Sequence, residues 1–198
     1  MPATYVPNTA FELRVSNHIF DKTKNVTGLF MNGPSNELCP AGWLVREADA
    51  LANEGYADLN NENAWIMEAA EGKESFIYAC NTFNVNEIQD PVTGNIYKVG
   101  TNTLGLPIPA GQRGTYTRID EGDIMRLGVG NFASAPTVGQ YATIQAGKLV
   151  PAADAPTAMG TLYFEVLSTG TFTQGAYASF AYYLLRAHRV RTVVDSPV

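Results

Sequence analysis

The sequence predicts a mainly β protein, and three observations support this fold class. The 18 glycines and 11 prolines supply many turn formers, while 10 tyrosines and 9 phenylalanines supply aromatic residues that favour strands. Several short segments alternate between apolar and polar residues, which is the period-2 pattern of a half-buried strand. The sequence contains neither a heptad repeat nor a long amphipathic helical pattern. We expect a small C-terminal β-barrel, preceded by an irregular N-terminal half that also contains strands.

Residues 1–42 are predicted to form an extended N-terminal arm, because prolines and glycines interrupt this segment repeatedly. Two short apolar runs within it indicate strands, the first by alternation with polar residues and the second by its continuous apolar character. The arm has no obvious core of its own, so we expect its apolar side chains to pack on the rest of the domain or on a neighbouring subunit. The candidate interaction residues in the arm are Phe11, Leu13, Val15, Leu29, Phe30 and Met31.

Residues 43–100 are predicted to form an acidic, β-rich region. The part from 43 to 90 contains ten acidic residues and few basic ones. Short apolar and aromatic runs at 43–45, 64–67 and 76–79 indicate strands. The acidic stretch is typical of a solvated face, and its functional alternative is a surface complementary to a basic partner.

Residues 101–198 are predicted to form the C-terminal barrel-like domain. Turn-forming residues at 120–123 and at 145–147 separate strand-like runs, and each group predicts a hairpin. Further strands are expected at 161–167 and at 177–190, where apolar and aromatic residues dominate.

The C-terminal half is unusually poor in charge. Between Leu127 and Leu185 the only charged residues are Lys148, Asp154 and Glu165. In the run from 180 to 185 successive residues are apolar, so both faces of the strand should be covered. A small barrel covers only one face. We therefore expect a homo-oligomer, a trimer or a dimer, in which the outward-facing member of the pair Tyr182 and Tyr183 lies near a contact.

No arrangement of residues typical of catalysis is visible in the sequence. It contains no GxSxG elbow, no P-loop and no GxGxxG followed by a helix. The two histidines, His18 and His188, are far apart and near neither Cys39 nor Cys80, so the spacing does not predict a zinc site. A pair of carboxylates for glycoside hydrolysis stays open, because such partners need only be close in space. We expect no enzymatic activity, no cofactor and no metal.

Composition bears on the partners and on the compartment. The net charge of −6 argues against direct binding to nucleic-acid phosphates, which requires a basic face. No apolar run approaches the length of about 18 residues that a membrane span needs, and the first residues do not form a signal-peptide pattern. We expect synthesis in a reducing cytoplasm, with both cysteines as free thiols.

The segment from Pro91 to Val190 resembles a known family. It contains DPVTGNIYKVG, then the glycine-tipped hairpin ATIQAGKLVP, an Ala/Pro-rich loop, the aromatic strand LYFEV and a closing strand. This pattern is similar to that of small structural proteins encoded beside the major capsid protein in phages of Gram-positive bacteria, the head decoration or cement proteins. The resemblance implies a β-tulip-like barrel domain without catalytic residues. The long N-terminal half, residues 1–90, departs from the small members of the family.

The resemblance implies a virion protein, made in the host cytoplasm and located on the capsid exterior. It would bind the major capsid protein at capsomer junctions and stabilise the shell through many weak contacts. One alternative is a tail, neck or fibre component of the same particle. Another is a glycan-binding module with Trp43, Trp65 and Tyr56 as its aromatic platform. Copy number in purified particles would distinguish the first two, and a glycan array would test the third.

Overall fold

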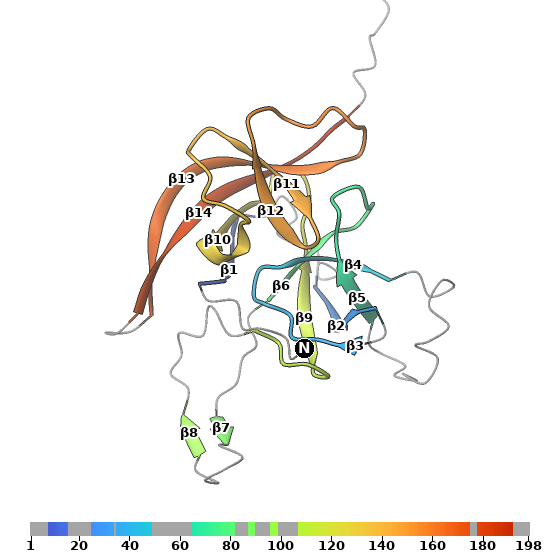
Figure 1. Cartoon of the computed structure of the whole chain (residues 1–198), viewed down its shortest axis with the longest axis vertical. Coiled ribbons are helices and arrows are strands. Elements are labelled where there is room, and N and C mark those ends of the chain that lie inside the picture. The colour runs from blue at the N-terminus through green and yellow to red at the C-terminus, as the bar shows by residue number, and fades with distance from the viewer. Residues whose placement is uncertain are drawn as a thin grey trace, which may run out of the picture.

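The computed structural model describes residues 8–15, 25–33, 35–48, 65–81, 87–89, 96–98, 107–174 and 178–191. Within these ranges the chain is almost entirely β-structure, and its one helical element is a short 3-10 turn, η3 (Val129–Asn131). The predicted mainly β fold class is confirmed. Figure 1 shows two β units side by side, a barrel and a larger curved sheet.

Five strands close into a barrel in the order β2-β5-β4-β6-β9, because β9 also pairs with β2. The pairing of β2 with β5 is parallel and the other barrel pairings are antiparallel. A short strand, β3 (Ser35–Asn36), pairs with the end of β2. Closure leaves none of the five strands with an open edge along its paired length. The barrel strands are β2 (Asn25–Asn32), β4 (Leu44–Glu47), β5 (Trp65–Ala69), β6 (Tyr78–Cys80) and β9 (Arg113–Arg118).

The second unit is an open six-stranded sheet in the order β1-β10-β14-β13-β11-β12, with antiparallel pairing throughout. A separate antiparallel pair, β7 (Glu87–Gln89) and β8 (Ile96–Lys98), belongs to neither unit. The strands of the six-stranded sheet are β1 (Phe11–Val15), β10 (Ile124–Gly128), β11 (Tyr141–Gln145), β12 (Lys148–Ala152), β13 (Leu162–Gln174) and β14 (Ala178–Arg189).

The barrel has its own core, formed by alternate residues of its strands. Ile108 packs among these residues next to Gly114, where an added Cβ would lie 1.8 Å from the Ile108 Cδ1 atom. Only glycine therefore leaves room for Ile108 at this point of β9. The barrel core consists of Phe30, Cys39, Val45, Met67, Tyr78, Cys80, Ile108 and Tyr116.

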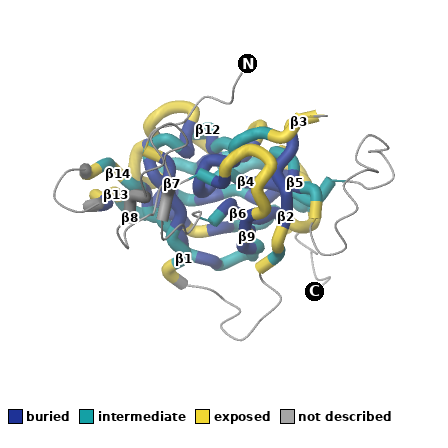
Figure 2. Tube along the Cα trace, turned by 90° about the horizontal axis from the view of Figure 1, so that it is seen from below, coloured by how far each residue is buried: buried dark blue, intermediate teal, exposed yellow. Residues whose placement is uncertain are grey.

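The larger core lies between the barrel and the six-stranded sheet. The barrel contributes residues such as Leu44 and Ile77, and the sheet contributes Leu127, Phe164 and Leu185; all five are 0% exposed. Figure 2 shows this buried material running through the centre of the molecule, with exposed residues around it. Burial of each large apolar side chain stabilises the folded state by roughly 1.5–3 kcal/mol. The inner face of the sheet is thus covered by the chain's own N-terminal half.

The barrel lies in a different part of the chain from the one expected. We expected it within residues 101–198, but its strands run from Asn25 to Arg118, and the C-terminal half forms the open sheet. The expected boundaries are also crossed, since β9 (113–118) closes the barrel and β1 (11–15) forms an edge of the sheet. The alternation of residues shows which side chains of a strand share a face, but it does not show which strands pair with one another. The sequence therefore did not reveal that β9 belongs to the barrel and β1 to the open sheet.

The turn at residues 120–123 is a corner between the two units and not the predicted hairpin, since β9 and β10 belong to different sheets. Its backbone groups pair with β14: Gly122 N donates to Ala187 O at 2.8 Å, and Ala187 N donates to Asp123 O at 2.9 Å. The buried Asp123 carboxylate accepts a hydrogen bond from Asp120 N at 2.9 Å. These bonds direct the chain away from the barrel. The predicted turn at 145–147 does join a hairpin, β11 to β12, and Ala146 and Gly147 both have positive φ there.

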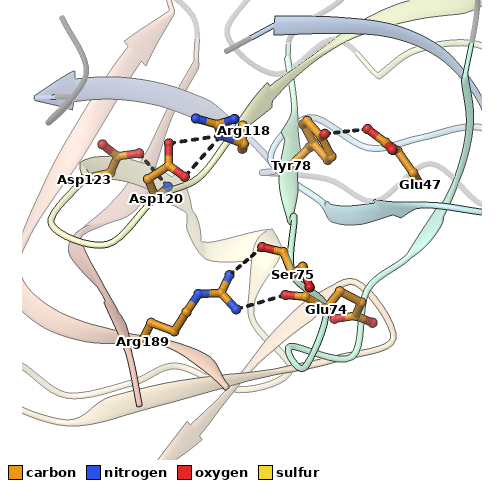
Figure 3. A network of polar contacts seen from close by, with 8 residues as sticks. All are labelled: Glu47, Glu74, Ser75, Tyr78, Arg118, Asp120, Asp123 and Arg189. Atoms are coloured by element: carbon orange, nitrogen blue, oxygen red, sulfur yellow. Dashed lines mark hydrogen bonds and ion pairs between the residues drawn. The ribbon is translucent and has the colours of Figure 1, made fainter. Parts of the chain in front are cut away.

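Polar contacts also connect the two units (Figure 3). Arg189, at the end of β14, donates hydrogen bonds to the carbonyl oxygens of Glu74 at 3.0 Å and Ser75 at 3.3 Å, in the loop between β5 and β6. It also donates to Gly160 O at 2.6 Å. Elsewhere in the network Tyr78 donates to Glu47, within the barrel. The guanidinium of Arg189 therefore ties the end of β14 to two other backbone segments, residues 74–75 and Gly160.

Candidate interaction surface

The outer face of the six-stranded sheet, which points away from the barrel, is the candidate functional site. Along the strands, buried inward-facing residues alternate with outward-facing residues that mostly keep part of their surface exposed, and Phe172, at 4% exposed, is a buried exception. The barrel lies on the opposite face, and the described strands form no second sheet over this one. We call this surface the outer sheet face, and its main residues are Glu12, Arg126, Tyr141, Tyr163, Glu165, Gly170, Phe172, Phe180, Tyr182, Leu184, Arg186 and His188.

Strand β14 shows how the apolar run at 180–185 is divided between the two faces. Tyr183 and Leu185 point inward and are 7% and 0% exposed, and the Tyr183 ring packs edge-on against Phe132 at 4.9 Å. Tyr182 and Leu184 point outward and are half-buried. Of the two tyrosines singled out by the sequence, Tyr182 is therefore the one on the outer sheet face.

A β-bulge changes which residues of β13 face outward. The register with β14 shifts between Val166 and Ser168, so one extra residue stands on β13 at that point. Before the bulge Phe164 points into the core, and after it Phe172 joins the outward-facing residues opposite Phe180. The bulge thus turns Phe172 to this side of the sheet, where it is 4% exposed and packs against Phe180 and Tyr182.

An aromatic group occupies the hairpin end of this face, and we call it the hairpin cluster: Phe172, Phe180 and Tyr182, with Arg126. The Phe172 ring centroid lies 4.7 Å from that of Tyr182 and 5.4 Å from that of Phe180. The Arg126 guanidinium lies 4.7 Å above the Tyr182 ring, a cation–π contact. Gly170 makes room for this arrangement, since an added Cβ would lie 2.4 Å from the Tyr182 ring.

Glu12 of β1 completes the charged border of the hairpin cluster. Its carboxylate accepts hydrogen bonds from Arg126 at 3.1 Å and from Arg14 at 2.7 Å. The Arg126 guanidinium is thereby fixed between a carboxylate and an aromatic ring. A fixed guanidinium beside large aromatics is the combination that dominates the energy of many protein interfaces.

A second group, the His188 cluster, lies farther along β13 and β14: Tyr141, Tyr163, Glu165, Arg186 and His188. The Tyr163 and His188 rings are stacked with centroids 5.3 Å apart, and Tyr141 meets Tyr163 edge-on at 5.8 Å. His188 Nε2 lies 3.2 Å from Glu165 Oε2, and Arg186 lies 4.0 Å from the same oxygen. Burial, with smaller effects of Tyr141, Glu121 and Glu165, raises the pKa of Tyr163 above its usual value, so its hydroxyl stays a donor at neutral pH.

The packing of these rings limits what the His188 cluster can bind. One face of the Tyr163 ring is covered by His188, and Tyr141 packs against the same ring. The ring edges and hydroxyl groups of these side chains are of the kind that protein interfaces contact.

Two of the three aromatic residues suggested for a glycan platform, Trp43 and Trp65, lie within the described residues. Trp43 packs edge-on against Phe30 at 6.1 Å, and the Lys148 ammonium lies 5.9 Å from its ring. Trp65 is 55% exposed, on barrel strand β5. Tyr56 lies outside the described residues. Trp43 also lines a groove of about 340 Å³ beside the β2–β3 turn, with Glu37 and Glu68 among its walls.

Most of the candidate residues in the predicted arm lie inside the molecule. Phe11 is 7% exposed in the larger core, which Leu13 also contacts, and Phe30 lies in the barrel core. Leu29 and Met31 are buried with Ile66 in a small separate cluster. Val15 pairs with Ile124 at the end of β1, and its side chain lies outside the described residues. The described residues of this segment therefore form strands β1, β2 and β3, and their buried side chains belong to the chain's own cores.

Several residues of the outer sheet face were not identified from the sequence. Tyr141 and Tyr163 occur in segments whose alternation was visible, but their proximity depends on the pairing of β11 with β13. Arg126 and Glu12 come from strands 114 residues apart in the chain. The alternation of charged with apolar residues in these strands indicated an outward face, but only the register shows that these faces adjoin.

The described residues contain no group of three or more His, Cys, Asp or Glu side chains that could hold a metal ion. Among them there is also no helix long and apolar enough to cross a membrane. Comparison with protein-family models, with curated proteins and with solved structures finds no match in any of the three.

Proposed function

We propose that this chain is a structural protein of a phage particle that decorates the head shell and binds the major capsid protein through the outer sheet face. The observation that carries the proposal is a sheet whose inner face is covered by the chain's own barrel and whose outer face has aromatic residues and arginines but no described covering layer. Such a face suits a protein partner because large aromatics and arginine are enriched at interface hot spots.

Charge supports the same function. The whole chain has a charged fraction of 16%, against about 25% in an average soluble protein. On the outer sheet face the described charges are largely paired with one another, as Glu12 is with Arg126 and Glu165 is with Arg186. Such pairs can be covered by a partner at lower desolvation cost than isolated charges. Many modest contacts per copy, repeated over a shell, would give large collective stabilisation.

Binding of purified chain to particles that lack it tests this proposal. We expect wild-type protein to bind in hundreds of copies per particle, and the variant Tyr182→Asp to bind at least tenfold more weakly, because it places a carboxylate in the hairpin cluster. Trp65→Asp is the matched control, since Trp65 is an exposed aromatic on the barrel and should be dispensable. A handful of copies would favour a tail, neck or fibre component. Equal binding by the two variants would contradict the assignment of the outer sheet face.

A further inference from the structure

Strand β13 continues well beyond its outer neighbour in the sheet. It pairs with β14 along its length, from Leu162 to Gln174, but the register with β11 ends at Glu165. The last backbone bonds on that side connect Val166 with Gly139 and Gln140. From Leu167 to Gln174 no described strand pairs with the outer edge of β13 (Figure 1). An eight-residue length of strand edge, 167–174, therefore presents backbone groups with which no described strand pairs.

Beyond the bulge at Val166, this edge has none of the charged residues or prolines that often prevent edge pairing. The sequence from Val166 to Leu185 contains no charged residue and no proline. Natural sheets commonly protect exposed edges with lysine, proline or a covering segment. A two-stranded ribbon is also marginally stable in water without further strands or a covering layer. The end of the β13–β14 hairpin is such a two-stranded ribbon, so a strand from a partner that pairs along β13 would stabilise it.

We propose that the partner is a second copy of this chain, paired antiparallel along β13 about a two-fold axis at Thr171. An isologous pair places each residue opposite its symmetry mate, so an uncharged edge avoids the like-charge repulsion that self-pairing otherwise creates. In this register Thr171 lies opposite Thr171 of the other copy, and threonine pairs are favourable across strands.

The pairing would join the outer sheet faces of the two copies. Gly170 and Phe172 belong to the outer sheet face, so the hairpin clusters of both copies would become neighbours. A dimer would then present two copies of the shell-binding surface on one continuous sheet, which raises avidity without new contacts to the shell. The dimer itself does not depend on the identity of the shell partner, so it is tested in solution without particles.

Sedimentation velocity or light scattering of the purified full chain tests the pairing. We expect a species of twice the 21.4 kDa chain mass at micromolar concentration. Thr171→Lys should shift the mass to that of one chain, because two ammonium groups would meet at the two-fold axis. Thr115→Lys, an exposed threonine in barrel strand β9, should remain dimeric. A monomeric wild-type chain at about 100 µM would overturn the proposal, as would a Thr171→Lys variant that stays dimeric.

A cysteine variant gives a readout that does not depend on weakening the dimer. Opposite residues of antiparallel strands have Cα atoms about 4.5–5.5 Å apart, within the range that a disulfide spans. Glutathione disulfide should therefore oxidise Thr171→Cys to a covalent dimer, in which two thiols lose two protons and two electrons to the oxidant. The natural Cys39 and Cys80 are 0% exposed and should not compete. If Thr171→Cys forms no more covalent dimer than Thr115→Cys, the proposed register is wrong.

Discussion

The adjacent residues Leu184 and Leu185 of β14 give a sharp test of how the two faces of the sheet differ. Leu185 is 0% exposed in the core between the sheet and the barrel, whereas Leu184 is half-buried on the outer sheet face. Truncation of a fully buried leucine to alanine costs about 2–5 kcal/mol, from lost burial and from the cavity left behind. Truncation of Leu184 in the isolated chain should cost about 1 kcal/mol or less, because no layer covers it.

Urea unfolding of the two variants under identical conditions measures this difference. We expect Leu185→Ala to lower the free energy of unfolding by about 2–5 kcal/mol and Leu184→Ala by about 1 kcal/mol or less. For a chain of this length, each kcal/mol corresponds to about 2–4 °C in Tm, so the two variants should also differ clearly in thermal unfolding. Because the chemical change is the same and the positions are adjacent, differences in strand propensity are minimised. Equal losses at both positions would refute the assignment of an inner and an outer face.

Three further predictions concern the junction, the barrel core and pH. In urea unfolding, Arg189→Met should lower the free energy of unfolding by about 1.5–3 kcal/mol, since three carbonyl groups lose a charged donor. The control Arg186→Met, at an exposed position, should lower it by less than about 1 kcal/mol. Gly114→Ala should lower stability by about 1–3 kcal/mol through overpacking against Ile108, and Ile108→Ala in the same chain should recover part of the loss; purely additive losses would contradict this account. Burial raises the pKa of Cys39 and of Tyr116, so the folded state holds their protons while the unfolded chain releases them near pH 9–10. These two groups should therefore leave the free energy of unfolding unchanged below about pH 8 and lower it as pH rises beyond 10. The loss should be smaller in Tyr116→Phe. A free energy of unfolding that stays constant up to pH 11 would contradict the prediction.

The sequence was most informative where local pattern determines structure. Alternation at Phe11, Leu13 and Val15 predicted the strand that became β1, and the turn at Ala146 and Gly147 predicted the β11–β12 hairpin. Both features depend on neighbouring residues alone: one on the period of the pleat, the other on residues that adopt positive φ.

The partners of each strand could not be predicted in the same way. The turn at 120–123 has the composition of a hairpin, but its backbone groups bond to Ala187, about 65 residues farther along the chain. Strand β9 closes the barrel against β2, across a sequence separation that no periodicity records. The bulge after Val166 also reverses the side on which later residues of β13 fall.

The candidate surface was predicted in part. The two-sided apolar character of residues 180–185 indicated that one tyrosine faces outward, and the structure places Tyr182 there. The contributions of Arg126, Tyr163 and His188 depend on strand register and on cross-strand packing, so they emerged only from the fold. The apolar residues at 29–31 indicated a contact surface but are buried in the chain's own interior.

A cryo-EM map of a phage particle that carries this chain tests the proposed shell contact most directly, because the map would show which face of the chain meets the shell. The account predicts that the outer sheet face, with Tyr182 and Arg126 near the centre of the contact, lies against the major capsid protein and that the barrel points toward solvent. A map in which the outer sheet face is open to solvent while the barrel contacts the shell would contradict it.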